Sequence, residues 1–97
     1  MARALSVSRV RVRGGADAEY LSAVRELAGL AEQRGWHLWV FQRRGEPGVY
    51  LEFSESRSAE AHRGVAPRPE DERRLEERIR AVADYDPGAW DLWEEVG

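Results

Sequence analysis

The chain's two histidines, His37 and His62, are its candidate proton acceptors. A neutral imidazole titrates near physiological pH, so either side chain would accept a proton from a phenolic substrate. The plainer interpretations are that His62 is a surface residue next to Arg63 and that His37 packs at the rim of an interface. The sequence leaves both alternatives open.

A second group of residues would bind a planar molecule. Glu52 with Arg9 or Arg11 would orient a carboxylate or hydroxyl, or would form an interface salt bridge, because a buried charge needs a partner. Aromatic rings would stack on an aromatic ligand or fill a dimer interface, where such residues are enriched. These rings are Trp39, Phe41, Tyr50 and Trp93.

The elements that position these residues follow from hydrophobic periodicity. Polar and apolar residues alternate over residues 4–13, which predicts a strand. An apolar stripe over residues 17–34 predicts a helix that Asp17 caps and Gly35 ends. Residues 36–43 and 49–54 are expected to form a hairpin around the turn GEPG. A short helix is expected over 57–62 and a longer one from Pro69, with Glu76 and Arg80 on its solvent side. AWDLWEEV would be the last strand. This β-α-β-β-α-β order predicts an α+β, ferredoxin-like sandwich, with four antiparallel strands and both helices on one face.

The sheet has two apolar faces. Assuming an even number of residues in the hairpin turn, we expect the helix-covered face to hold Val10, Val12, Trp36, Leu38, Val40, Val49, Leu51, Phe53, Trp90 and Leu92. A slip of one residue would exchange the strand faces. The other face would hold Leu5, Val7, Arg9, Arg11, His37, Trp39, Phe41, Tyr50, Glu52, Asp91 and Trp93. Monomers rarely expose so large an aromatic patch, so we expect a second copy of the chain to cover it.

Composition excludes several classes of protein. The 97 residues fit a single domain, 1–97, with no segment apolar and long enough to span a membrane or act as a signal peptide. The absence of cysteine fits a reducing cytoplasm, and all basic residues are Arg, as in a GC-rich, bacterial genome. A net charge of −3 argues against nucleic-acid binding. No HExxH, CxxC, GxxxxGK or GxSxG motif is present, so neither a metal nor a nucleotide site is predicted.

The run PGVYLEFSESRSAEAHR resembles the W-x-S-x-x-A-x-x-A-H stretch of antibiotic-biosynthesis-monooxygenase-like domains, with Phe53 where Trp is usual and His62 at the final position. The resemblance implies a homodimeric α+β barrel. Some members oxidise quinol-like substrates without metal or flavin, others degrade haem or isomerise lactones, and others have no established activity. The haem-degrading branch relies on an Asn, and this chain has none.

We therefore expect a cytoplasmic homodimer that binds a small aromatic or apolar molecule between sheet and helices. If it is an enzyme, it would be a cofactor-independent monooxygenase in which His62 or His37 assists deprotonation. The alternative is a non-catalytic dimer that binds a ligand or another protein.

Overall fold

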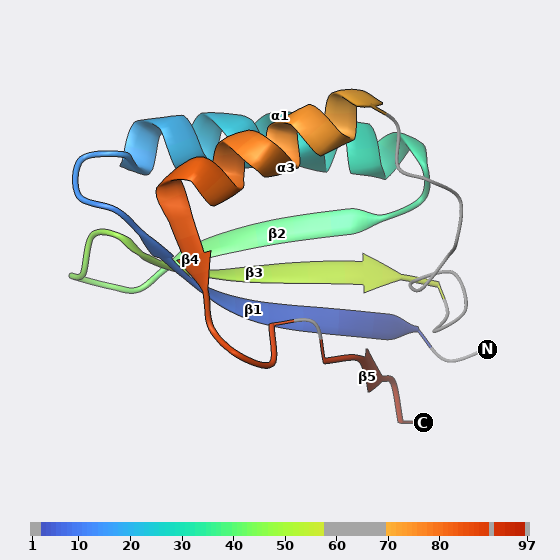
Figure 1. Cartoon of the computed structure of the whole chain (residues 1–97). Coiled ribbons are helices and arrows are strands. Elements are labelled where there is room, and N and C mark those ends of the chain that lie inside the picture. The colour runs from blue at the N-terminus through green and yellow to red at the C-terminus, as the bar shows by residue number, and fades with distance from the viewer. Residues whose placement is uncertain (1–2, 58–69, 90, 97) are drawn as a thin grey trace.

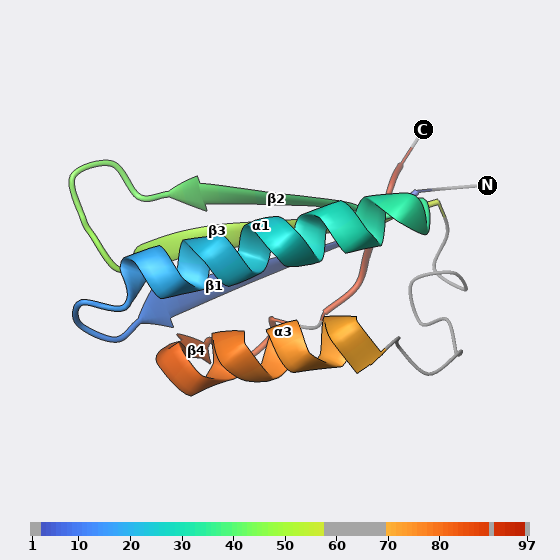
Figure 2. The ribbon, with the colours of Figure 1, turned by 90° about the horizontal axis from the view of Figure 1, so that it is seen from above.

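A computed structural model describes residues 3–57, 70–89 and 91–96. In chain order the elements are β1 (Ala4–Val12), α1 (Asp17–Gln33), β2 (His37–Gln42), β3 (Val49–Ser56), α3 (Glu70–Val82), β4 (Ala83–Tyr85) and β5 (Trp93–Glu94). The antiparallel sheet has the order β2-β3-β1-β4, and β5 pairs with the start of β1. Both helices lie on one face of the sheet, side by side (Figures 1 and 2). The predicted ferredoxin-like α+β fold is confirmed.

The first helix forms where its apolar stripe predicts. Tyr20, Val24 and Ala31 are buried against the sheet, and the chain leaves the helix at Gly35, whose φ of +82° favours glycine. The predicted cap is wrong: no side-chain hydrogen bond caps α1. Asp17 instead accepts hydrogen bonds from the backbone N–H of Gly48 and the hydroxyl of Tyr50, which tie the start of α1 to β3.

The predicted register of the hairpin is also wrong. Gln42 pairs with Tyr50, so an odd number of residues, 43–49, separates the paired positions. Tyr50 and Glu52 therefore share the helix-covered face with Leu38 and Val40. The residues that β3 places on the opposite face are Val49, Leu51 and Phe53, next to His37, Trp39 and Phe41 of β2.

The last strands differ from the prediction as well. The fourth strand is the short segment β4, which follows α3 directly and pairs with the end of β1. Of AWDLWEEV, only Trp93 and Glu94 form a strand, opposite Leu5 and Ala4. Asp91 and Leu92 precede that strand and line the helix side. Trp90, His62, Pro69 and the expected short helix lie outside the described residues, apart from Arg57, which is not helical.

The apolar core lies at one end of the space between sheet and helices. There Val10, Tyr20, Val24, Tyr50 and Ile79 form one buried cluster, with the rings of Tyr20 and Tyr50 in contact, their centroids 4.9 Å apart. Within the described residues, no helix has the length and apolar character needed to cross a membrane.

Candidate functional site

A cavity of about 450 Å³ lies between the sheet and the helices, beside the apolar core. Its polar floor comes from the inward positions of the two central strands, Ser6 and Ser8 on β1 and Glu52 and Ser54 on β3. Apolar side chains form its walls, among them Leu27, Leu38 and Ile79. A cavity that combines apolar walls with convergent polar groups is a candidate small-molecule site, and this one has an unusually large share of polar residues.

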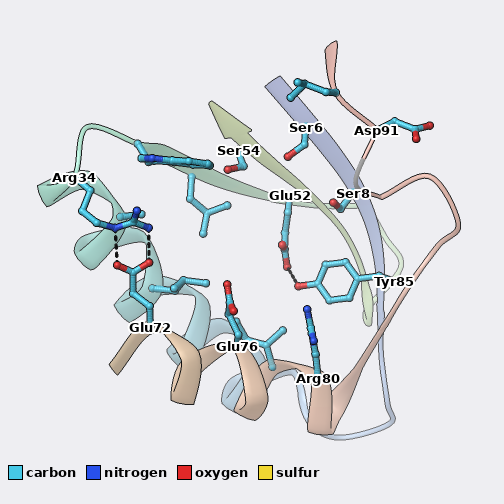
Figure 3. Close-up of a pocket in the computed structure, with 16 residues that line it drawn as sticks. Ser6, Ser8, Arg34, Glu52, Ser54, Glu72, Glu76, Arg80, Tyr85 and Asp91 are labelled. Atoms are coloured by element: carbon cyan, nitrogen blue, oxygen red, sulfur yellow. Dashed lines mark hydrogen bonds and ion pairs between the residues drawn. The ribbon is translucent and has the colours of Figure 1, made fainter. Parts of the chain in front are cut away.

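Glu52 is the most chemically distinctive group in this cavity. Its Oε2 accepts hydrogen bonds from the hydroxyl of Tyr20 on α1, at 2.6 Å, and from the hydroxyl of Tyr85 on β4, at 2.7 Å. Figure 3 shows Glu52 and Tyr85 facing each other, with Glu76 and Arg80 of α3 projecting toward the same space. Three elements distant in sequence thus fix the position of one carboxylate.

The environment changes the acidity of all three groups. Burial raises the pKa of Glu52, and the hydrogen bonds from Tyr20 and Tyr85 offset part of that rise because they stabilise the charged form. Burial, followed by the nearby charge of Glu52, raises the pKa values of Tyr20 and Tyr85 well above the usual range. The tyrosines are therefore hydrogen-bond donors, and Glu52 is the most acidic of the three groups and the candidate proton acceptor.

Among the described residues, the hydrogen bonds to the carboxylate of Glu52 reach one of its two oxygens. Both tyrosine hydroxyls bond to Oε2, and within the described residues the structure gives no hydrogen bond to Oε1. A carboxylate can accept several hydrogen bonds, so Oε1 can serve a ligand while Oε2 stays in place. This arrangement suits proton transfer to or from a bound hydroxyl.

An ion pair encloses another part of the cavity. Arg34, at the end of α1, donates from Nε and Nη2 to the two oxygens of Glu72 on α3, at 2.7 and 2.6 Å. The side chain of Glu72 is only 2% exposed, and the guanidinium also lies 5.6 Å from the ring centre of Trp36. These three residues line the cavity and join the ends of the two helices.

The predicted site residues separate into two groups. Glu52 lines the cavity, whereas Tyr50 lies on the same face but packs in the core, where burial first and then the hydrogen bond to Asp17 raise its pKa to about 12. The open face of the sheet carries His37, Trp39, Phe41, Arg9, Arg11 and Trp93. The ring of His37 stacks on Trp39 with centroids 5.8 Å apart. The predicted pairing of Glu52 with an arginine is wrong, because Arg9 lies on the open face and reaches Asp86 at 4.0 Å.

Several residues of the site escaped prediction. Tyr20 falls within the helix predicted over residues 17–34, and Tyr85 falls within no predicted element. A tyrosine on an apolar stripe usually needs a partner for its hydroxyl. The serines of β1 alternate with apolar residues and offered a second signal for a polar inner face. Glu76 and Arg80, predicted on the solvent side, line the cavity. Across the described residues, no cluster of His, Asp and Glu is arranged to bind a metal ion.

Comparison with known proteins rests on structure. No family model and no curated protein matches the chain. SnoaB, a cofactor-independent oxygenase from Streptomyces nogalater, matches with a TM-score of 0.78 at 17% identity, covering 100% of this chain and 94% of SnoaB. A conserved protein from Methanosarcina mazei Go1 gives 0.77 at 11% identity, covering 99% and 95% of the two chains.

A protein from Caulobacter crescentus CB15, proposed to be an antibiotic biosynthesis monooxygenase, gives a TM-score of 0.75 at 15% identity over 99% of this chain and 92% of that one. The chain has the antibiotic-biosynthesis-monooxygenase-like fold. At these identities the likeness concerns the fold, because one fold supports many activities. The chemistry of this chain therefore depends on the residues of its own cavity.

Proposed function

We propose that this chain is a cofactor-independent monooxygenase of a quinol-like or phenolic aromatic molecule, which binds in the cavity between sheet and helices. The observation that carries the proposal is the half-buried carboxylate of Glu52, which lines the cavity and is fixed at Oε2 by two tyrosine hydroxyls. The similar fold of SnoaB, a cofactor-independent oxygenase, supports the same reaction class.

In the proposed reaction, Oε1 of Glu52 accepts the proton of a substrate hydroxyl. The resulting anion is electron-rich and transfers electrons to molecular oxygen, which is the second substrate. Over the whole reaction a phenol and O2 give a quinone and water: the phenol O–H and one ring C–H become carbonyl groups. One oxygen atom enters the product and the other leaves as water. The chain supplies orientation, exclusion of water and the proton acceptor.

The two histidines, His37 and His62, differ in whether they are candidate proton acceptors for the proposed reaction. His37 lies on the open face of the sheet and does not line the cavity. His62 lies outside the described residues, so it stays a proposed second proton acceptor. Replacing each histidine by Ala separates their roles from that of Glu52.

The test is oxygen uptake with a panel of phenols and hydroquinones. Glu52→Gln keeps the size of the side chain and removes the proton acceptor, so turnover should fall at least about 100-fold, as for loss of a general base. Glu77→Gln removes a carboxylate from an exposed position of α3 and should have no effect. Wild-type turnover that survives Glu52→Gln would contradict the proposal. Binding of the phenols without any oxygen uptake would favour the non-catalytic alternative.

We also propose that a second copy of the chain covers the open face of the sheet. This face exposes 58% of Phe41, 43% of Trp39, 37% of Leu51 and 61% of Trp93. Phe53 contacts Phe41 edge to face, with centroids 5.5 Å apart, so the rings form a continuous patch. Such a patch is typical of a protein interface, and pairing of two identical faces satisfies both copies at once.

Light scattering during gel filtration tests the dimer. The wild type should elute at twice the mass of the chain. Phe41→Glu should produce a monomer, because it places an unpaired carboxylate within the apolar patch. Gln33→Glu adds the same charge at an exposed position of α1 and should remain dimeric. A monomeric wild type, or a Phe41→Glu variant that stays dimeric, would refute this interface.

A further inference from the structure

The floor of the cavity is unusually polar for the inner face of a sheet. The inward residues of β1 are Ala4, Ser6, Ser8, Val10 and Val12, so the apolar pattern is interrupted where the cavity lies. Ser6 and Ser8 are 6% and 4% exposed, and a buried hydroxyl costs free energy unless it has a hydrogen-bond partner. Small residues at these two positions leave room for the cavity above the sheet.

Ser54 is the serine best placed to meet a ligand. It pairs with Ser6 across the β1–β3 ladder and with Leu38 across the β2–β3 ladder, so it lies in the middle of the floor. The hydroxyl of Ser8 is occupied, because it donates to the backbone carbonyl of Ala89 at 2.8 Å. For the hydroxyl of Ser54 the structure gives no hydrogen bond within the described residues, although the side chain lines the cavity.

Ser54 and Glu52 form two separate polar points on one surface. They are two residues apart on the same face of β3, which places their Cα atoms about 7 Å from each other. Figure 3 shows the side chain of Glu52 extending away from Ser54, toward Tyr85. The apolar side chains of Leu27, Leu38 and Ile79 line the same cavity, and an aromatic ring fits against them.

We infer that Ser54 is a second oxygen-binding subsite, so that the cavity selects an aromatic ligand with oxygen substituents at its two opposite ends. This inference rests on the proposed function, since it takes the cavity as the ligand site and Glu52 as the partner of the first hydroxyl. Because the side chain of Glu52 extends away from Ser54, oxygens at opposite ends of a ligand suit the two groups better than two neighbouring hydroxyls do. Ser54 thereby determines specificity, while Glu52 performs the proton transfer.

The test uses three naphthalene probes in calorimetric titrations without oxygen, so that binding is measured apart from turnover. The probes are 2,6-dihydroxynaphthalene, with oxygens at opposite ends, 2,3-dihydroxynaphthalene, with neighbouring oxygens, and 2-naphthol, with one. The wild type should bind the 2,6 isomer about five- to tenfold more tightly than either other probe, the gain of one hydrogen bond.

Variants assign that preference to Ser54. Ser54→Ala should lower the affinity for the 2,6 isomer to that for 2-naphthol and leave 2-naphthol binding within about twofold, because only one hydrogen bond is removed. Ser54→Thr keeps a hydroxyl in a residue that favours strands and should retain the preference. Ser22→Ala, at an exposed position of α1, should behave as the wild type.

Three results would overturn the inference. Equal wild-type affinity for the two diols would remove the second subsite, and so would a Ser54→Ala variant that weakens all three probes alike. Both results leave the proposed function standing, because 2-naphthol still binds. Failure of every probe to bind the wild type would overturn the inference and the proposed ligand site together. Thermal unfolding of each variant verifies that lost binding does not reflect lost folding.

Discussion

Replacing Arg34 by Ala leaves the carboxylate of Glu72 buried without its partner. Glu72 is 2% exposed, and both of its oxygens accept hydrogen bonds from Arg34, at 2.7 and 2.6 Å. Within the described residues no other cation forms an ion pair with Glu72, so the variant leaves a buried carboxylate without a counter-ion. The pair also joins the C-terminal end of α1 to the first turn of α3.

The size of the effect follows from the burial of the two partners. Removal of one partner from a buried ion pair costs about 3–5 kcal/mol. The side chain of Arg34 is 36% exposed, so water can approach from that side, and we expect the lower limit, about 3 kcal/mol. For a domain of this size, that loss lowers the unfolding midpoint by about 12–24 °C.

Urea denaturation of a double-mutant cycle measures this energy. The cycle comprises Arg34→Ala, Glu72→Ala and the double variant. The double variant should lose about 2 kcal/mol less unfolding free energy than the sum of the two single losses, because the energies of residues in contact are coupled. Arg74→Ala is the matched control. It removes the Arg74–Glu70 pair of the same helix, whose side chains are 73% and 76% exposed, and should cost at most about 1 kcal/mol. If Arg34→Ala costs no more than Arg74→Ala, the argument from burial is refuted.

Three further predictions concern Glu52 and the turn before β3. Because burial raises the pKa of Glu52, the folded chain holds this proton more tightly than the unfolded chain, so stability falls as pH rises from the ordinary pKa through the raised one. Glu52→Gln should therefore be more stable than the wild type at pH 7 and lose that advantage at pH 4 in urea titrations; an equal difference at both pH values would contradict this. Tyr85→Phe removes a hydrogen bond that lowers the pKa of Glu52, so the acidic limb of the pH–rate profile should move to higher pH, and an unmoved limb would disprove the link. Gly48→Ala should destabilise the chain by about 1–2 kcal/mol, because Gly48 has a φ of +85° and a Cβ there would lie 3.2 Å from the carbonyl oxygen of Val12. Gly14→Ala is the control: a Cβ there meets open space, so this variant should be neutral in the same unfolding assay.

Periodicity predicted the arrangement of helices and strands well. Alternation in β1, the stripe of α1 and the glycine after it each reflect local chemistry that the fold preserves. β4 was missed because Ala83–Tyr85 follows α3 without a turn residue between them. A strand of three residues carries too little pattern to be distinguished from the end of a helix.

The candidate site was harder to predict because it depends on whether the hairpin turn between β2 and β3 contains an odd or an even number of residues. An even number was predicted, because it places the purely apolar sets of residues on the helix side. That prediction put Leu51 and Phe53 on the inner face and Glu52 on the outer face. In the structure, Glu52 and Ser54 lie on the inner face and line the cavity, and the apolar set lies on the open face. The number of residues in the turn decides the faces, and neither hydrophobic pattern nor turn composition determines it.

The cluster around Glu52 lay beyond sequence reasoning for a further reason. Tyr20, Glu52 and Tyr85 come from α1, β3 and β4, and only tertiary packing brings the two hydroxyls to one carboxylate oxygen. Glu52 was predicted to contact a ligand, and it lines the cavity. The predicted register, however, placed it on the open face of the sheet and not on the helix side.

A crystal structure of the chain with bound 2-naphthol tests the central claim most directly. If the ligand site lies at Glu52, the ring will lie between the sheet and the helices, with its hydroxyl within hydrogen-bond distance of Oε1 of Glu52. A ring bound on the open face, among Trp39, Phe41 and Trp93, would contradict the account and return the ligand site to the aromatic face.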